Sequence, residues 1–213
     1  MYTRTSIISS MLWPKLQNFV PIESQQKDTF VFVDQSRYNQ MQRFAITSCI
    51  NAVKFPFSQD KFVLIQGPPG TGKTHTLVGI VKNLFANAED NDKPLRVMLC
   101  APSNGAIDEI ARRLIHERHF LVAHKKRSLR VVRIGQRAQV HANVQKYLLD
   151  SLIDRNMKQE PNTSLPRIRD QILFKADVLL STLQSSQQSC LKIFDQTSSK
   201  LAIRCVIVDE ASQ

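Results

Sequence analysis

The chain has 213 residues, enough for one domain with a full hydrophobic core. Hydrophobic residues make up 42% and charged residues 22%, and no apolar run approaches the roughly 20 residues of a membrane-spanning helix, so we expect an intracellular globular protein without a membrane partner. The net charge of +11 is concentrated between Arg112 and Arg137, which fits either a polyanionic partner or a basic face turned to solvent.

Strands and helices are expected to alternate, after an N-terminal flank over residues 1–36 that carries little signal. Apolar spacing predicts a helix over 38–54, a second after a glycine loop and through Phe85, and a third from Ser103 or Asn104 through Ile115. Strands are predicted at 62–65, 96–101, 129–134, 178–181 and 205–208. This alternation predicts an α/β fold with a parallel sheet covered on both faces, and the polar stretch 138–175 is interpreted as a small helical insertion.

The glycine loop has the pattern G-x-x-x-x-G-K-[ST] and stands between a predicted strand and a predicted helix. In a phosphate-binding loop, or P-loop, glycines let backbone N–H groups turn toward phosphate oxygens, and the helix N-terminus adds partial positive charge. We therefore expect ATP to bind here, with Lys73 at its β and γ phosphates and the Thr74 hydroxyl on Mg²⁺. The loop consists of Gly67, Pro68, Pro69, Gly70, Thr71, Gly72, Lys73 and Thr74.

A second candidate for phosphate chemistry follows the last predicted strand. The apolar run 205–208 delivers Asp209 and Glu210 at its C-terminal end, where ligands bind in open α/β sheets. This is interpreted as a Walker B element, in which Asp209 holds magnesium and Glu210 orients and deprotonates the attacking water. An apolar run that ends in Asp-Glu is common by itself, and the P-loop upstream is what favours the catalytic interpretation.

The same P-loop sequence occurs in ring-forming AAA+ ATPases, but the distance from Lys73 to Asp209 is much longer than a compact AAA+ core gives. Residues 99–109 instead resemble motif Ia of the Upf1-like superfamily 1 helicases, and 206–213 resemble their motif II. Residues 38–42 are similar to the motif that precedes the P-loop in that group, and 178–183 to a nucleic-acid-contacting segment. Details in the insertion, at 147–151 and 155–158, resemble the senataxin-like branch, although the insertion is shorter than in that branch.

This resemblance covers residues 38–213 and implies the first RecA-like domain of an ATP-dependent helicase. The domain is expected to extend over 37–213. It would then end just after Walker B and before motif III. The resemblance places the Gln42 amide at the adenine edge, and Ser103, Asn104 and Thr182 at nucleic acid. It further implies 5′ to 3′ movement on single-stranded RNA or DNA or on RNA–DNA hybrids, in the nucleus, with ATP and Mg²⁺. An isolated chain of this length is expected to be inactive or weak.

Simpler interpretations of the same residues stay open. Ser103 and Asn104 could only cap a helix, Thr182 could only end a strand, and Gln42 could only face solvent. For the chain as a whole, the alternatives are another P-loop ATPase that remodels protein, or a non-catalytic fragment that binds ATP without unwinding.

Overall fold

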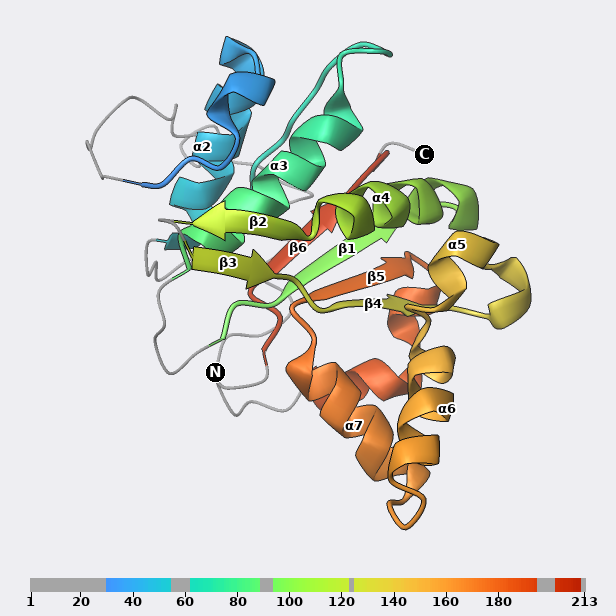
Figure 1. Cartoon of the computed structure of the whole chain (residues 1–213). Helices are drawn as coiled ribbons and strands as arrows, with labels where there is room; N and C mark the ends of the chain where they lie inside the picture. The colour runs from blue at the N-terminus through green and yellow to red at the C-terminus, as the bar shows by residue number, and fades with distance from the viewer. Residues whose placement is uncertain (1–29, 55–61, 89–93, 123–124, 195–201, 212–213) are drawn as a thin grey trace, which may run out of the picture.

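A four-stranded parallel sheet forms the centre of the molecule (Figure 1). The computed structural model describes residues 30–54, 62–88, 94–122, 125–194 and 202–211. In the sheet, the strands lie in the order β4, β5, β1, β6, and every neighbouring pair is parallel. Their bounds are Val97–Ala101 for β1, Val131–Ile134 for β4, Val178–Thr182 for β5 and Cys205–Val208 for β6. The expected parallel α/β fold is confirmed.

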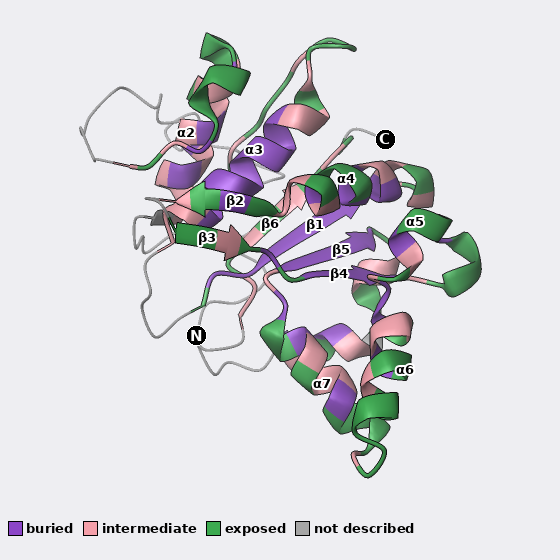
Figure 2. Ribbon diagram, in the orientation of Figure 1, coloured by how far each residue is buried: buried purple, intermediate pink, exposed green. Residues whose placement is uncertain are grey.

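The two central strands, β1 and β5, are buried along their whole length (Figure 2). Successive side chains of a strand point to opposite faces of a sheet. On β1, Val97 and Leu99 pack into one apolar cluster, and Met98 and Cys100 pack into a second. The first cluster includes the helices around the P-loop, and the second includes the part of the stretch 138–175 that follows Leu148. Both faces are therefore covered, as the apolar strand runs predicted.

The helices occupy the positions that the apolar spacing predicted. The long helices of the first cluster are α2 (Gln40–Lys54), α3 (Lys73–Ala86) and α4 (Asn104–Glu117). The insertion is helical, with α5 (Ala142–Gln145), α6 (Leu149–Gln159) and α7 (Leu165–Lys175). Short 3₁₀ turns are η2 (Gln35–Arg37), η3 (Arg137–Gln139), η4 (Ser185–Gln187) and η5 (Ser189–Phe194). None of the helices in the described ranges is both long and apolar enough to cross a membrane.

Side-chain caps fix where the helices α2 and α4 begin. At α2, the Asn39 carboxamide accepts a hydrogen bond from the Gln42 backbone N–H at 2.9 Å, and the Gln42 carboxamide accepts one from the Asn39 N–H at 3.0 Å. This reciprocal pair is a capping box, which satisfies two N–H groups that a helix start leaves unpaired. At α4, Ser103 Oγ accepts from the Ala106 N–H at 3.1 Å, as the sequence predicted.

Two elements differ from the sequence-based expectation. Residues 62–65 form no strand, and Leu64 is 85% exposed there. The reason is that no described strand lies beside this segment: β6 is the edge of the sheet, and its Val206 is 60% exposed. The second difference is an antiparallel hairpin of β2 (His119–Val122) and β3 (Lys125–Ser128), which the sequence analysis missed because the run of basic residues hides any alternation.

The contrast between the centre and the edge of the sheet can be tested by truncation. Leu99 of β1 is fully buried, so Leu99→Ala should lower the free energy of unfolding by about 2–5 kcal/mol through lost burial and the cavity left behind. The exposed Val206 of β6 is the control, and Val206→Ala should change that free energy by less than about 0.5 kcal/mol. Urea denaturation measures both, and equal losses would contradict this placement of the core.

Candidate functional site

The predicted P-loop runs from Gly67 into the first turn of α3, and two of its glycines have a left-handed backbone. Gly70 and Gly72 have φ angles of 79° and 83°, in the left-handed region that glycine adopts without a steric cost. A Cβ on Gly72 would lie 2.9 Å from Gln42 Nε2, and one on Gly67 would lie 2.8 Å from Thr71 Oγ1. Gly67 and Gly72 therefore allow close packing, and Gly70 and Gly72 allow the turn.

Lys73 lies at the start of α3 with its ammonium folded over the loop. Its Nζ donates hydrogen bonds to the carbonyl oxygens of Gly67 at 2.9 Å and Pro68 at 3.0 Å. The side chain is exposed, so the ammonium can exchange these carbonyls for phosphate oxygens without crossing the core. Thr74 follows in the first turn of α3 and is half-buried, beside the helix N-terminus that favours anions.

Gln42 is joined to the P-loop through its side-chain amide. Its Nε2 donates to the Thr71 carbonyl oxygen at 3.1 Å, while its Oε1 is held by the capping box of α2. The structure thus places Gln42 beside the nucleotide loop, and the recognition of adenine by its amide stays a prediction. The amide nitrogen carries two hydrogens, and one of them is used by the bond to Thr71.

An aromatic pair beside this loop was missed by sequence reasoning. Tyr38 is buried, and its ring stacks on His75 of α3 at 4.8 Å between centroids. Burial raises the pKa of Tyr38 to about 12, and the nearby Glu117 carboxylate adds to the shift, so the phenol stays neutral. The only signal in the sequence was an aromatic residue just before the helix that carries Gln42.

Four charged side chains hold the segment before α2 against α3 and α4. Lys82 of α3 is buried, and its Nζ lies 2.5 Å from Asp34 Oδ2 and 3.0 Å from Glu117 Oε2 at the end of α4. Arg37 donates to both Glu117 oxygens, at 2.8 and 3.1 Å. Burial opposes the ionisation of Glu117, but the hydrogen bonds from Lys82 and Arg37 outweigh it and hold its pKa below the usual value.

Asp209 and Glu210 follow β6 at the carboxyl edge of the sheet. The Asp209 N–H donates to the Cys100 carbonyl oxygen at 2.9 Å, which continues the pairing of β6 with β1. Glu210 is exposed and has a φ of 52°, rare for a residue other than glycine, and its N–H donates to Asp209 Oδ1 at 3.1 Å. Among the described residues, no hydrogen bond or ion pair joins these carboxylates to the P-loop.

Magnesium would find few protein ligands at this site. Within the described ranges, no three His, Cys, Asp or Glu side chains gather as a metal site. Thr74 and Asp209 offer the hard oxygen atoms that Mg²⁺ prefers, and Mg²⁺ in nucleotide sites is usually bound by one or two such groups together with phosphate oxygens. Thr74 and Asp209 are the residues that would hold such an ion, and their joint role stays a prediction.

The three candidate nucleic-acid residues lie near one another at the same edge. Ser103 and Asn104 follow β1 at the start of α4, and Thr182 ends β5, where it pairs with Ala101 of β1. Ser103 is exposed, whereas Thr182 is buried and its Oγ1 accepts a hydrogen bond from the Ser185 N–H at 3.1 Å. Thr182 is thus used to fix the turn after β5, while Ser103 faces solvent.

A buried arginine behind Asn104 is a further residue that the sequence analysis missed. Arg133 of β4 is fully buried, and it contacts Asp108 and Asn104 of α4. The available signal was a charged residue inside an apolar strand, together with Asp108 beside the apolar face of a helix. A buried charge of either kind normally has an opposite charge as its partner.

The basic segment 112–137 does not form one continuous face. Ion pairs with nearby carboxylates hold Arg112, Arg113, Arg130, Arg133 and Arg137. Three other cations, at 125–127, lie on β3, in the hairpin that follows the C-terminal end of α4 (Figure 1). Much of this basic segment is therefore paired with carboxylates, and the cations on β3 are not gathered at Ser103.

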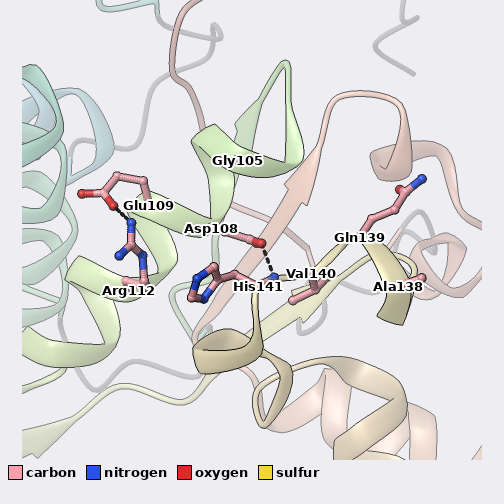
Figure 3. Close-up of a pocket in the computed structure, with 8 residues that line it drawn as sticks. All are labelled: Gly105, Asp108, Glu109, Arg112, Ala138, Gln139, Val140 and His141. Atoms are coloured by element: carbon pink, nitrogen blue, oxygen red, sulfur yellow. Dashed lines mark hydrogen bonds and ion pairs between the residues drawn. The ribbon is translucent and has the colours of Figure 1, made fainter.

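A hollow of about 410 Å³ lies between α4 and the segment after β4 (Figure 3). In the figure, Asp108 reaches the backbone of His141, and Glu109 pairs with Arg112 on the rim. The hollow begins at Gly105, directly after Asn104. The residues that line it are Gly105, Asp108, Glu109, Arg112, Ala138, Gln139, Val140 and His141.

Comparison with known proteins agrees with this geometry. The family described as the AAA domain matches residues 37–169, more than half of the chain. The chain is 35% identical over 139 residues to the probable helicase senataxin of Homo sapiens, which covers 58% of this chain and 5% of that protein. It is 34% identical over 124 residues to the DNA-binding protein SMUBP-2 of Mus musculus, covering 58% and 11%.

A third relative covers more of the chain. The ATP-dependent helicase upf1 of Schizosaccharomyces pombe is 30% identical over 168 residues, which is 70% of this chain and 17% of that protein. In each of the three cases, the matching region is a small part of a much longer protein.

Removing the P-loop ammonium should abolish tight nucleotide binding. Lys73→Ala is expected to cost on the order of 3–4 kcal/mol, because a preorganised charge on the phosphates is lost. Titration with a fluorescent ATP analogue measures the affinity. Lys158→Ala, which removes an exposed cation from α6, is the control and should bind as the wild type does. Unchanged affinity in Lys73→Ala would contradict the assignment of the P-loop.

The ion pairs at Glu117 should make stability depend on pH in a defined direction. Because its pKa is lowered in the fold, Glu117 contributes stability above its ordinary pKa of 4.5, and this contribution is lost as the pH falls through the folded value. Glu117→Gln should therefore be less stable than the wild type at pH 7, and the difference should shrink below about pH 4.5.

Denaturation with urea at a series of pH values measures this difference. The control is Glu160→Gln, which changes an exposed carboxylate in the turn after α6. If the difference in the free energy of unfolding between Glu117→Gln and the wild type stayed constant from pH 7 to pH 3, the charge of Glu117 would not be the source of the stability.

Proposed function

Since the chain belongs to the AAA domain family that it shares with the senataxin-like and Upf1-like helicases, we propose that it is the first RecA-like ATPase domain of a nucleic-acid helicase. In this proposal the domain extends over 37–213, with an insertion at about 138–175. It binds ATP with Mg²⁺, and hydrolysis drives movement along single-stranded RNA or DNA, with 5′ to 3′ polarity and RNA–DNA hybrids as substrates. The proposed location is the nucleus.

One observation carries this proposal: the carboxylates after β6 and the capped N-terminus of α4 lie at the carboxyl edge of one parallel sheet, and the P-loop helix α3 packs in the apolar cluster on one face of that sheet. In such a sheet, ligands bind outside the carboxyl ends of the strands. Asp209 follows β6, Ser103 follows β1, and the backbone bond from the Asp209 N–H to the Cys100 carbonyl links the two strands. A change at Asp209 therefore has a short path to Ser103 and Asn104, the candidate nucleic-acid residues after β1.

We assign each candidate residue a role in this proposal. Lys73 neutralises phosphate charge inside a cradle of backbone groups. The cradle is formed by Gly67, Pro68, Pro69, Gly70, Thr71 and Gly72. Thr74 and Asp209 supply oxygen atoms to the metal, which when bound neutralises charge that develops on the phosphates. Glu210, exposed and held at a positive φ, orients the attacking water and accepts its proton. Gln42 selects the base.

The test compares binding with turnover. In the whole protein, Glu210→Gln should keep its affinity for ATP while hydrolysis falls by orders of magnitude, because the base is lost but the metal ligands remain. Single-stranded RNA or DNA should raise the turnover of the wild type. The affinity for single-stranded RNA or DNA should fall as the salt concentration rises. The logarithm of the affinity should fall by about 0.7 per unit of the logarithm of the salt concentration for each neutralised phosphate.

Two outcomes would contradict the proposal. Hydrolysis that is indifferent to RNA and DNA would favour a P-loop ATPase that remodels protein. Full turnover in Glu210→Gln together with lost ATP affinity would show that the roles of the two carboxylates are wrong. A fluorescent ATP analogue measures nucleotide affinity, a phosphate-release assay measures hydrolysis, and a labelled oligonucleotide measures nucleic-acid affinity.

A further inference from the structure

We propose that Arg133 is a positioning residue for strand binding, which fixes the orientation of Asn104 at the start of α4. This inference rests on the proposed function, because it assumes that the strand binds at Ser103 and Asn104. Arg133 itself lies behind that surface, on β4, and is fully buried. It would act through Asn104 and Asp108 rather than by touching the strand.

The guanidinium is the centre of a network that joins β4 to α4. Its Nε donates to Asp108 Oδ1 at 2.9 Å, its Nη2 donates to Asn104 Oδ1 at 2.8 Å, and its Nη1 donates to the Ile134 carbonyl oxygen. The side chain of Asp108 is itself only 7% exposed. A buried ion pair of this kind adds little net stability compared with apolar residues, but it specifies one arrangement of the groups around it.

The contact with Arg133 decides which way the Asn104 amide faces. A guanidinium has donors and no acceptor, so the oxygen of the amide must turn toward it. The amide nitrogen, Nδ2, then faces the other way, where it donates to Gln139 Oε1 at 3.1 Å. Nδ2 carries two hydrogens, and no second acceptor for it is found among the described residues. Asn104 thus offers a donor to an approaching acceptor, such as a phosphate or base oxygen.

Asp108 extends the same network to the wall of the hollow described above. Its Oδ2 accepts the His141 backbone N–H at 2.7 Å, which ties the segment after β4 to α4 (Figure 3). The carboxylate would repel a polyanion if it were free. Because Arg133 compensates this charge, the hollow next to Asn104 can receive part of a nucleic-acid strand without that repulsion.

The local sequence is built for an arginine at this position. A Cβ on Gly135 would lie 2.9 Å from Arg133 Nη1, so a residue with a side chain there would displace the guanidinium. Lysine keeps the charge but has a single nitrogen, which cannot hold Asp108 and Asn104 in the planar arrangement that the guanidinium imposes. Arg133→Lys therefore separates charge from orientation.

The experiment measures the affinity of this chain for a fluorescein-labelled single-stranded oligonucleotide and, separately, for a fluorescent ATP analogue. Arg133→Lys should weaken strand binding about tenfold, the effect of one misplaced charge-linked hydrogen bond, and change ATP affinity less than about twofold. The matched control is Arg130→Lys. Arg130 also pairs with an aspartate, donating to both carboxylate oxygens of Asp177, but it is exposed and precedes β4 at the opposite edge of the sheet, so nucleic-acid affinity should stay unchanged.

A double-mutant cycle distinguishes positioning from a general loss of structure. If Arg133 acts through Asn104, then Arg133→Lys should have little further effect on strand affinity once Asn104→Ala is present. An equal tenfold loss in both backgrounds would overturn the proposal, as would a parallel loss of strand and ATP affinity. Unchanged strand affinity in Arg133→Lys would overturn it too.

Asn104→Asp keeps the proposal testable if Arg133→Lys does not fold. Asn104 is half-buried at the helix start, and aspartate still accepts from Arg133 but has no donor for the strand. Strand affinity should fall at least about tenfold while the unfolding temperature stays near that of the wild type. Wild-type strand affinity in this variant would overturn the proposal. Absence of strand binding by the wild-type chain would instead refute the proposed function, and this inference with it.

Discussion

All four strands of the main sheet run in the same direction, and the other features of the molecule depend on this constraint. Parallel strands bring their carboxyl ends to one edge, so the residues after β1, β5 and β6 meet although they are far apart in sequence. The strands must also be covered on both faces, which requires α3 and α4 on one side and α6 and α7 on the other. Packing and the placement of reactive groups are thus decided together.

Within this frame, charged side chains determine how the helices sit relative to one another. Lys82 joins α3 to the last residue of α4, and Arg133 joins β4 to the first turn of α4. Buried ion pairs contribute little net stability but penalise every arrangement in which one partner is left alone. The helix that carries Asn104 is therefore fixed at both ends, by one network near the P-loop helix and another near the hollow.

The periodic elements could be predicted from the sequence, because apolar spacing and capping are local signals. The P-loop and the start of α4 at Ser103 could be predicted because each depends only on residues that are neighbours in the sequence. The segment 62–65 could not be predicted in this way. Its apolar residues suit a strand, but a strand needs a neighbour, and no described strand pairs with this segment; β6 remains the edge of the sheet. The partners of Arg133 and Lys82 were equally hidden, because a pairing across 25 or 35 residues is a property of the fold.

The contact between Tyr38 and Gly79 links two distant positions of the chain. Gly79 lies in the middle of α3, where glycine is normally unfavourable by about 1 kcal/mol compared with alanine. A Cβ there would come within 2.7–2.8 Å of two ring carbons and the hydroxyl oxygen of Tyr38, so the phenol rests directly on the helix backbone. In evolution, a larger residue can enter position 79 only if position 38 becomes smaller, and the two positions should therefore vary as a pair across related proteins.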